Sequence, residues 1–192
     1  MGEPVLFQYL SEINSNIFNE IGNKPIITGD PHSYYTFTRE YPGKDHLEIY
    51  HYTQFLNTLL DKGQLKLSSG IEKRVTYHDP CYLGRHGGIF DEPRTLIERI
   101  SGIDLVEMEQ HHEESDCCGM GGGRMWMEPT KGFLPSQAIS KKRVLQALAT
   151  GSEILLTACP FCNISLSDAV KDLGKEEDLK VMDITELICM AL

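Results

Sequence analysis

The sequence predicts an α/β fold, with a mostly parallel sheet and helices on its faces. Short apolar segments alternate along the chain with longer segments of helical periodicity, which is typical of strand–helix–strand units. Strands are expected at residues 24–28, 47–51, 73–78, 103–108, 153–157 and 180–183. Helices are expected at residues 4–22, 30–41, 53–60, 92–100, 136–148, 163–173 and 185–192.

Helix boundaries follow from capping and breaking residues. Asp30 and Ser136 precede helical segments and carry side chains that accept hydrogen bonds from free N–H groups. Gly22, Gly63 and Gly151 follow helical segments, where a glycine commonly ends the helix.

An internal echo is the second observation behind the predicted fold. Residues 27–33 align with residues 156–162, and residues 47–53 match residues 179–185. The strand–turn–helix–strand–helix unit therefore occurs twice, the first copy being degenerate.

The echo also predicts the domain organisation. Asp30 and Ser33 stand in the first copy where the second copy has Cys159 and Cys162. We expect residues 1–62 to be the tail of a degenerate cysteine-rich repeat and residues 71–192 to be one complete repeat.

Composition and charge exclude several classes of function. The 192 residues carry a formal net charge of −10, which argues against binding to nucleic acid or to an anionic membrane surface. No apolar run approaches the roughly 20 residues that span a bilayer, and the N-terminus lacks the pattern of a signal peptide. We expect a cytoplasmic chain with no direct membrane span and no nucleic-acid partner.

The chain has six cysteines. Without a secretory signal, clustered cysteines indicate metal ligands or redox groups rather than a disulfide framework. Cys189 lies in an apolar helix end, and we expect it to be buried and inert.

The other five cysteines follow predicted strands. Cys81 comes after one strand, Cys117 and Cys118 lie in the loop after another, and Cys159 and Cys162 come after a third. Because the carboxyl ends of parallel strands share one edge of a sheet, three loops can bring five sulfurs to one point.

The residues around these cysteines suit an anionic group. A Cys-x-x-Cys pair at a helix start lies near free N–H groups, which favour thiolates. Gly119 and the run Gly121–Gly123 let the backbone approach a bulky ligand. The pattern indicates a binding site for a metal–sulfur cluster.

Two alternatives remain open at this point. A structural zinc site needs four cysteines, usually as two Cys-x-x-Cys pairs, and would leave one thiolate over. A thioredoxin-like dithiol would use Cys159 and Cys162 alone, and nothing in that mechanism needs Cys81 or the vicinal pair.

Three motifs carry a resemblance to a known family: residues 77–86 (YHDPCYLGRH), 117–124 (CCGMGGGR) and 158–162 (ACPFC). They resemble the cysteine-rich CCG domain of heterodisulfide reductase catalytic subunits and of the iron–sulfur subunits of glycerol-3-phosphate dehydrogenase and glycolate oxidase. The resemblance covers residues 71–192. It implies that a 4Fe-4S cluster, in the non-cubane form, is bound by Cys81, Cys117, Cys118, Cys159 and Cys162, with Gly119 beside it.

The resemblance also implies a function. Such a chain would be an iron–sulfur oxidoreductase module that relays electrons from a flavoprotein or ferredoxin-like partner to a quinone or disulfide-type acceptor. Its partners would be other redox subunits, including a membrane quinone-reactive subunit that holds it at the inner membrane. Residues 128–135 lengthen the second gap between cysteine motifs, and the chain has no ferredoxin-like Cys-x-x-Cys-x-x-Cys module.

Other residues near the motifs are candidates for supporting roles. His78, His86 and Arg124 are expected to lie next to the cluster, where they could donate hydrogen bonds or screen charge. Arg94 either screens the cluster or pairs with Glu92.

The remaining candidates have more ordinary explanations. His111 and His112 are expected in a solvated loop rather than at a second metal site. Trp126 is expected to pack as a lid or in the core, with a partner-facing patch as the alternative.

Overall fold

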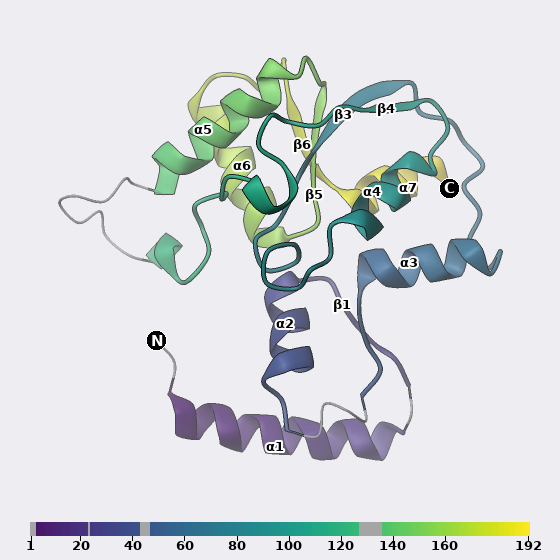
Figure 1. Ribbon diagram of the computed structural model, residues 1–192, viewed down its shortest axis with the longest axis vertical. Helices are drawn as coiled ribbons and strands as arrows, with labels where there is room; N and C mark the ends of the chain where they lie inside the picture. Colours follow the sequence, from purple (N-terminus) through teal and green to yellow (C-terminus); the bar gives the residue numbers. More distant parts are fainter. Residues whose placement is uncertain (1–2, 23, 43–46, 127–135) are drawn as a thin grey trace.

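The computed structural model describes residues 3–22, 24–42, 47–126 and 136–192 (Figure 1). Two sheets are present in this part, one with strand order β4-β3-β5-β6 and one that pairs β1 with β2. Every pairing is parallel, which confirms the expected α/β class. The strands are β1 (Ile26–Thr28), β2 (Ile49–His51), β3 (Lys73–His78), β4 (Ile103–Leu105), β5 (Ile154–Thr157) and β6 (Lys180–Asp183).

Helices follow most of these strands. They are α1 (Pro4–Ile21), α2 (Pro31–Arg39), α3 (Tyr52–Asp61), α4 (Asp91–Glu98), α5 (Ser136–Ala149), α6 (Pro160–Asp172) and α7 (Ile184–Ala191), with short 3-10 turns η2 (His112–Glu114) and η3 (Arg124–Trp126). No helix in the described ranges is long and apolar enough to cross a bilayer.

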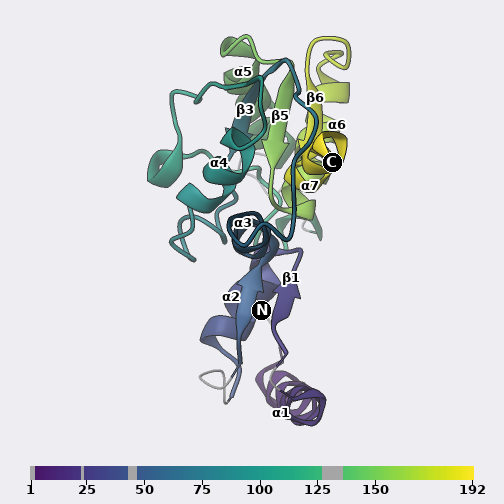
Figure 2. The same ribbon diagram turned by 90° about the vertical axis from the view of Figure 1, so that its right-hand side faces the viewer.

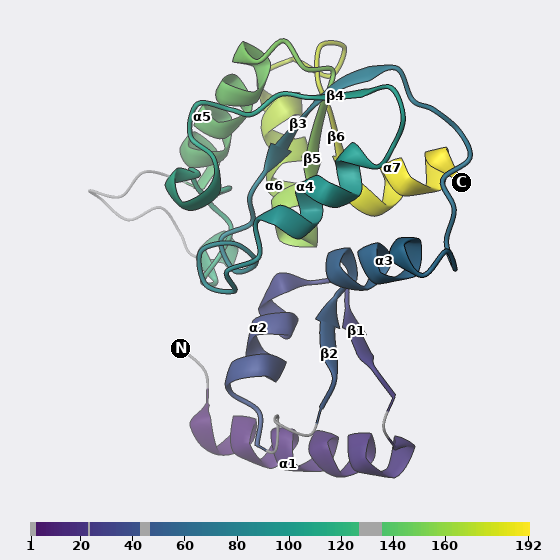
Figure 3. The ribbon, with the colours of Figure 1, turned by 45° about the vertical axis from the view of Figure 1, so that its right-hand side comes forward.

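The four-stranded sheet has a hydrophobic core on each face. Helices α4 and α7 lie on one side of this sheet and α5 and α6 on the other (Figure 3). Ile154 and Leu156 of β5 join the core formed with α4 and α7, while Leu155 between them joins the core formed with α5 and α6. This alternation follows from the period of two of a strand. Along β3 it places Val75 and Tyr77 in the first core, so that His78 lies on the opposite, α5 side of the sheet.

The smaller sheet forms an arm with α1 and α2, below the four-stranded sheet (Figure 2). Aromatic contacts hold the arm together: the Phe18 and Phe37 ring centroids are 5.7 Å apart, and those of Phe37 and Tyr41 are 4.7 Å apart. Most other apolar side chains of α1 are exposed, including Val5, Leu6, Tyr9, Leu10, Ile17 and Ile21. The helix therefore packs against its own arm through only part of its apolar surface.

The two units of the sequence echo have corresponding elements. β1 and α2 correspond to β5 and α6, and β2 and α3 correspond to β6 and α7. Asp30 is the N-cap of α2 and Cys159 is the N-cap of α6. His51 and Asp183 each begin the next helix with a capping box.

Several expected boundaries change in the structure. α6 begins at Pro160 rather than at Asn163, because a proline has the backbone angle of a first helical residue and needs no N–H partner. β4 ends at Leu105 instead of residue 108, since it is the edge strand and pairs only with Lys73 to Val75 of β3. The side chain of Ser136, which was expected to cap α5, lies outside the described side chains. The loop of residues 128–135 lies outside the described residues.

Two predictions about burial were wrong. Cys189 is exposed, because α7 buries the stripe formed by Ile184, Leu187, Ile188 and Ala191 and turns Cys189 away from it. Trp126 is 79 % exposed, so the expectation that it packs in the core was wrong, while the lid and the partner-facing patch stay predictions.

Candidate metal–sulfur cluster site

The cysteines lie on three loops that leave one edge of the four-stranded sheet. β3, β4 and β5 run in parallel, so their carboxyl ends lie on the same side. Cys81 follows β3, Cys117 and Cys118 lie in the connection after β4, and Cys159 follows β5. Residues far apart in the sequence are thereby brought together, as expected for an open parallel sheet.

The five cysteine side chains form one continuous chain of contacts. Hydrogen-bond contacts join Cys117 to Cys81 and to Cys118, and Cys159 to Cys162. The Sγ atoms of Cys162 and Cys118 are 3.3 Å apart and close the network. The five sulfurs named by the sequence motifs are therefore neighbours in space.

Within this network the pKa values of some thiols are lowered and those of others are raised. Hydrogen bonds from Cys118 and Cys81 lower the pKa of Cys117 to about 2, and its hydrogen bond to Cys117 raises the pKa of Cys118 to about 12. Contact with Cys162 and His32 lowers the pKa of Cys159 to about 6, whereas contacts with Cys118 and Cys159 raise that of Cys162. Neighbouring thiolates repel one another, so ionising all five requires a cation among them.

Glycines supply the backbone conformation of the Cys-Cys-Gly loop. Gly119 has a φ of 87°, a left-handed conformation that favours glycine, and its N–H donates to Cys117 Sγ at 3.2 Å. A Cβ added at Gly121 would lie 3.9 Å from Cys81 Sγ. The loop therefore places backbone close to the sulfurs.

A small cavity opens between the cysteine loops and the arm. Its lining consists of His32, Pro80, Cys81, Tyr82, Cys118, Gly121, Cys159, Phe161 and Cys162. The His32 ring centroid is 4.3 Å from that of Tyr82 and 5.3 Å from that of Phe161. Aromatic rings thus surround the sulfurs on the side that faces α2.

His32 was missed by the sequence analysis, which gave it no functional role. Its Nδ1 atom is 2.9 Å from Asp30 Oδ1, and its ring contacts Cys159. The hydrogen bond with Asp30, followed by the one with Cys159, raises the pKa of His32 to about 9. The signal available in the sequence was the echo, which aligns residues 30–33 with the Cys-x-x-Cys motif.

Hydrogen bonds to its neighbours stabilise the charged form of Asp30. Burial alone would raise its pKa, but hydrogen bonds from His32 and Ser33 outweigh burial and lower it. The two residues that replace cysteines in the first unit therefore bond to each other, with Ser33 Oγ 2.8 Å from Asp30 Oδ2.

Asp79, beside Cys81, fixes the geometry of two loops. Its carboxylate accepts two hydrogen bonds from Arg94, at 2.7 and 2.9 Å, and one from the His112 backbone N–H at 2.9 Å. Arg94 also donates to Glu107 at 2.6 Å. The pairing of Arg94 with Glu92 that was considered from the sequence is thus replaced by ion pairs with Asp79 and Glu107, because the side chain turns inward and is buried.

His78 lies fully inside the protein, at the end of β3. One ring nitrogen is within 4.8 Å of the Cys118 and Cys162 sulfurs. Nδ1 receives a hydrogen bond from Arg143 Nε at 3.0 Å. Burial, together with the Arg143 charge, lowers the pKa of His78 to about 3, so the ring is neutral. Arg143 is the second residue that the sequence analysis missed, because a single arginine in a mixed-polarity helix gives no local signal.

The other candidates lie further from the sulfurs. His86 is exposed and its ring lies 4.7 Å from that of Tyr82, at the rim of the aromatic group. Arg124 begins η3, directly after the glycine run. His111 and His112 have ligand atoms within 4.8 Å of one another and of Glu107, but that carboxylate is already bound by Arg94.

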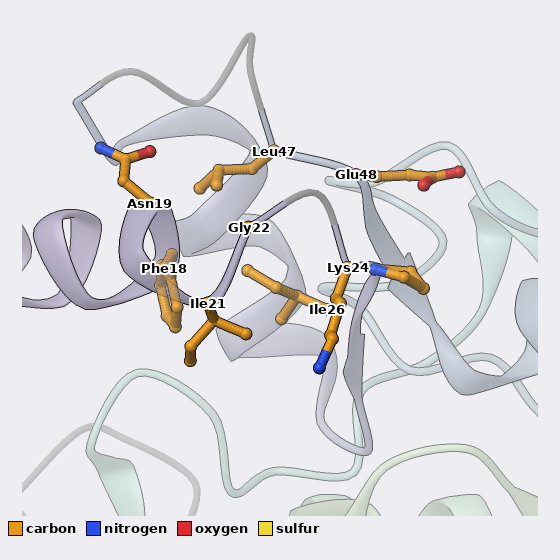
Figure 4. A pocket seen from close by; sticks show the side chains of 9 residues that line it. Phe18, Asn19, Ile21, Gly22, Lys24, Ile26, Leu47 and Glu48 are labelled. Carbon is orange, nitrogen blue, oxygen red and sulfur yellow. The ribbon is translucent and has the colours of Figure 1, made fainter.

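A larger cavity, of about 640 Å³, lies away from the cysteines, where α1 meets β1 (Figure 4). Its lining includes Phe18, Ile21, Ile26 and Leu47, with Lys24 and Glu48 as its charged residues. None of the five clustered cysteines lines it. The chemistry-bearing residues therefore gather in the small cavity rather than in the large one.

The fold and the thiol network together define a cysteine-rich domain of the parallel α/β type. Comparison with known families agrees: residues 75–167 match the model of the cysteine-rich domain called CCG, so this part of the chain is a domain of that family.

Curated relatives carry the likeness over more of the chain. The sequence is 38% identical to the probable iron-sulfur-binding oxidoreductase FadF of Bacillus subtilis and 39% identical to the EtfAB:quinone oxidoreductase of Syntrophomonas wolfei, in each case over 100% of this chain and 27% of the relative. It is 43% identical to a dihydromethanophenazine:CoB–CoM heterodisulfide reductase subunit of Methanosarcina barkeri, over 76% of this chain and 34% of the relative. The chain thus spans about a quarter to a third of the length of these relatives.

Proposed function

We propose that this chain binds an iron–sulfur cluster through Cys81, Cys117, Cys118, Cys159 and Cys162, and that it is an electron-carrying module of an oxidoreductase. The observation that carries the proposal is the single contact network of all five sulfurs, delivered by three loops. A structural zinc ion uses four ligands and a redox dithiol uses two, so neither accounts for five.

The cluster in this proposal is of the 4Fe-4S type. Five neighbouring cysteines exceed the four that hold an ordinary cubane cluster, which supports a non-cubane form. Backbone at Gly119 and Gly121 lies close enough to the sulfurs for amide groups to stabilise an anionic group. When bound, such a cluster supplies a centre that takes up and releases an electron, while the protein fixes its position and its surroundings.

We further propose that electrons arrive from a flavoprotein or a ferredoxin-like partner and leave to a quinone or a disulfide-type acceptor. Support comes from the relatives, one of which is named an EtfAB:quinone oxidoreductase and another a subunit of a heterodisulfide reductase. In this proposal the chain works in the cytoplasm, with other redox subunits, and reaches the inner membrane through a quinone-reactive partner.

The domain assignment is part of the proposal. Residues 1–62 are taken as the tail of a degenerate repeat and residues 71–192 as the complete cluster-binding repeat. The corresponding caps at Asp30 and Cys159, and the matching capping boxes at His51 and Asp183, support a common origin. Since Asp30 and Ser33 cannot act as thiolate ligands, the proposal places the cluster in the second unit only.

The first test is the metal content of protein purified without oxygen. We expect about four iron atoms and four sulfide ions per chain, and an EPR signal that changes on oxidation or reduction. About one zinc ion per chain with no sulfide would reject the proposal and favour a structural domain.

Serine substitutions assign the ligands. Cys81→Ser and Cys118→Ser are each expected to lower the iron content severalfold, because each removes one member of the sulfur network. Cys189→Ser is the matched control, since Cys189 is exposed on α7 and lies outside the network. Unchanged iron content in Cys81→Ser would reject the five-cysteine site. A protein without iron that loses thiol–disulfide activity only in Cys159→Ser and Cys162→Ser would instead point to a dithiol.

A further inference from the structure

Arg143 is a fully buried cation next to the cysteine site. It projects from α5, is 0% exposed, and donates to His78 Nδ1, the Gln110 carbonyl, Gln146 Oε1 and Ser115 Oγ at 2.8 to 3.0 Å. All four partners are neutral, and no ion pair of Arg143 occurs within the described residues. Burying a cation among neutral partners is costly, so negative charge nearby must offset it.

The negative charge comes from two sources. Asp79, Asp116 and Glu107 act on Arg143 over a longer range, and Cys162 acts on it from the cysteine site. Burial lowers the pKa of Arg143 to about 10, which leaves the guanidinium charged at neutral pH. A set of thiolates beyond His78 would therefore stabilise this cation, and the cation would stabilise the thiolates.

The hydrogen bond between Arg143 and His78 determines where the His78 proton lies. A guanidinium has donors only, so Nδ1 of His78 must act as the acceptor. The neutral imidazole then carries its single proton on Nε2. This atom is buried and has no hydrogen-bond partner within the described part of the chain, while a ring nitrogen lies within 4.8 Å of the Cys118 and Cys162 sulfurs.

We propose that Arg143 is a positioning residue of the cysteine site: it fixes the His78 tautomer whose Nε2–H is directed at the sulfurs of Cys118 and Cys162. This inference rests on the proposed function, because the hydrogen bond acts on cluster sulfurs. An N–H donor to a cluster sulfur stabilises the reduced, more negative state and so raises the reduction potential. Arg143 also donates a hydrogen bond to Ser115, which lies two residues before Cys117. The same side chain therefore contacts both His78 and the loop that carries Cys117 and Cys118.

The test is a double-mutant cycle in which the reduction potential of the full chain is measured by EPR. Arg143→Met and His78→Leu are each expected to lower the potential, so that the oxidised-to-reduced ratio at a fixed potential rises at least threefold. Combining them should shift the potential by clearly less than the sum of the two single shifts, because Arg143 acts in part through His78. Arg143→Lys keeps a cationic donor and should restore part of the loss.

Two controls separate this effect from simpler ones. Arg99→Met removes the same charge from an exposed ion pair with Asp61 and is expected to leave the potential unchanged. His78→Gln retains an N–H donor on its side chain and should shift the potential less than His78→Leu. In ENDOR spectra, an exchangeable proton coupled to the cluster should be present in the wild type and absent in His78→Leu.

The outcomes distinguish the inference from the function on which it depends. Wild-type protein without iron would overturn the proposed function itself. If Arg143→Met keeps the wild-type iron content and an unchanged reduction potential, the inference alone is overturned. The inference is also overturned if Arg143→Met shifts the reduction potential equally in the wild-type and the His78→Leu backgrounds. If Arg143→Met does not fold, Arg143→Lys takes its place in the cycle, with a smaller shift expected that is reduced further in the His78→Leu background.

Discussion

Two histidines lie beside the sulfurs and are fixed in opposite ways. His32 Nδ1 faces a carboxylate, which can only accept, so this nitrogen carries a proton. His78 Nδ1 faces a guanidinium, which can only donate, so this nitrogen carries none. The neighbour of each ring, rather than the ring itself, therefore decides which side can donate towards the cysteines.

Gly119 is expected to matter through its backbone angle. Its φ of 87° strains any other residue, so Gly119→Ala should lower stability by about 1–2 kcal/mol and also lower the iron content by disturbing the Cys117–Cys118 pair. Urea unfolding and iron analysis measure the two effects.

Gly63 offers a matched control for Gly119. It has a φ of 64°, no atom within 4 Å of an added Cβ, and a position after α3 that is remote from the cysteines. Gly63→Ala should reproduce the loss of stability with full iron content. Equal iron loss in both variants would show that the Gly119 backbone has no specific role at the site.

Cys189 is expected to be the most reactive thiol of the protein. It is exposed on α7, whereas Cys118, Cys159 and Cys162 are buried and Cys81 and Cys117 are half-buried. Brief treatment of the anaerobic protein with iodoacetamide should label Cys189 first and leave the iron content unchanged, as shown by mass spectrometry of peptides. Earlier labelling of Cys159 or Cys162 would contradict the described burial.

At the scale of elements, helix α7 depends on its cap. Asp183 accepts hydrogen bonds from the Thr185 N–H at 2.9 Å and the Tyr52 hydroxyl at 3.0 Å, and Glu186 accepts from the Asp183 N–H at 3.0 Å. Asp183→Ala removes both the cap and the link to α3. We expect a loss of about 1–2 kcal/mol in the free energy of unfolding, measured in urea.

Asp178→Ala is the control for the Asp183 prediction. Asp178 is exposed and pairs with Lys175 on the surface, so its loss should cost less than about 0.5 kcal/mol. Equal unfolding midpoints for the two variants would mean that the capping box contributes nothing measurable.

Elements were predicted well where their pattern is local. The bounds of β3 and β6 agree with the sequence, because strand periodicity and turn residues act within a few positions. β4 is shorter than expected, since its length depends on how much of β3 is available to pair with it. The exposed apolar face of α1 also could not be foreseen, because amphipathicity does not say what packs against a helix.

At the scale of the molecule, α3 joins the two units of the sequence echo. It belongs to the first unit, yet it lies beside α4 (Figure 3). Tyr52 lies in the core with α4 and α7, and Asn57 donates to the Glu92 carbonyl at 2.8 Å. The boundary at residue 62 in the sequence is therefore not a boundary between independent cores.

Fragments of the chain test this role of α3. A fragment of residues 47–192 should keep most of the stability of the full chain, whereas residues 66–192 should unfold at a clearly lower urea concentration, because the core loses Tyr52, Leu56 and Leu60. Circular dichroism during urea unfolding gives both midpoints. Identical midpoints would mean that the complete repeat is stable without α3.

The sequence by itself determined the fold class, the parallel strands and the edge on which the five cysteines meet. Strand and helix periods are local, and parallel topology then puts successive loops on one side. Only the tertiary structure decided that His32 contacts Cys159 and Arg143 contacts His78, that Arg94 binds Asp79 and Glu107, and that Cys189 faces solvent. Arg143 and His78 are 65 positions apart, and such contacts arise from packing between elements, which no local pattern records.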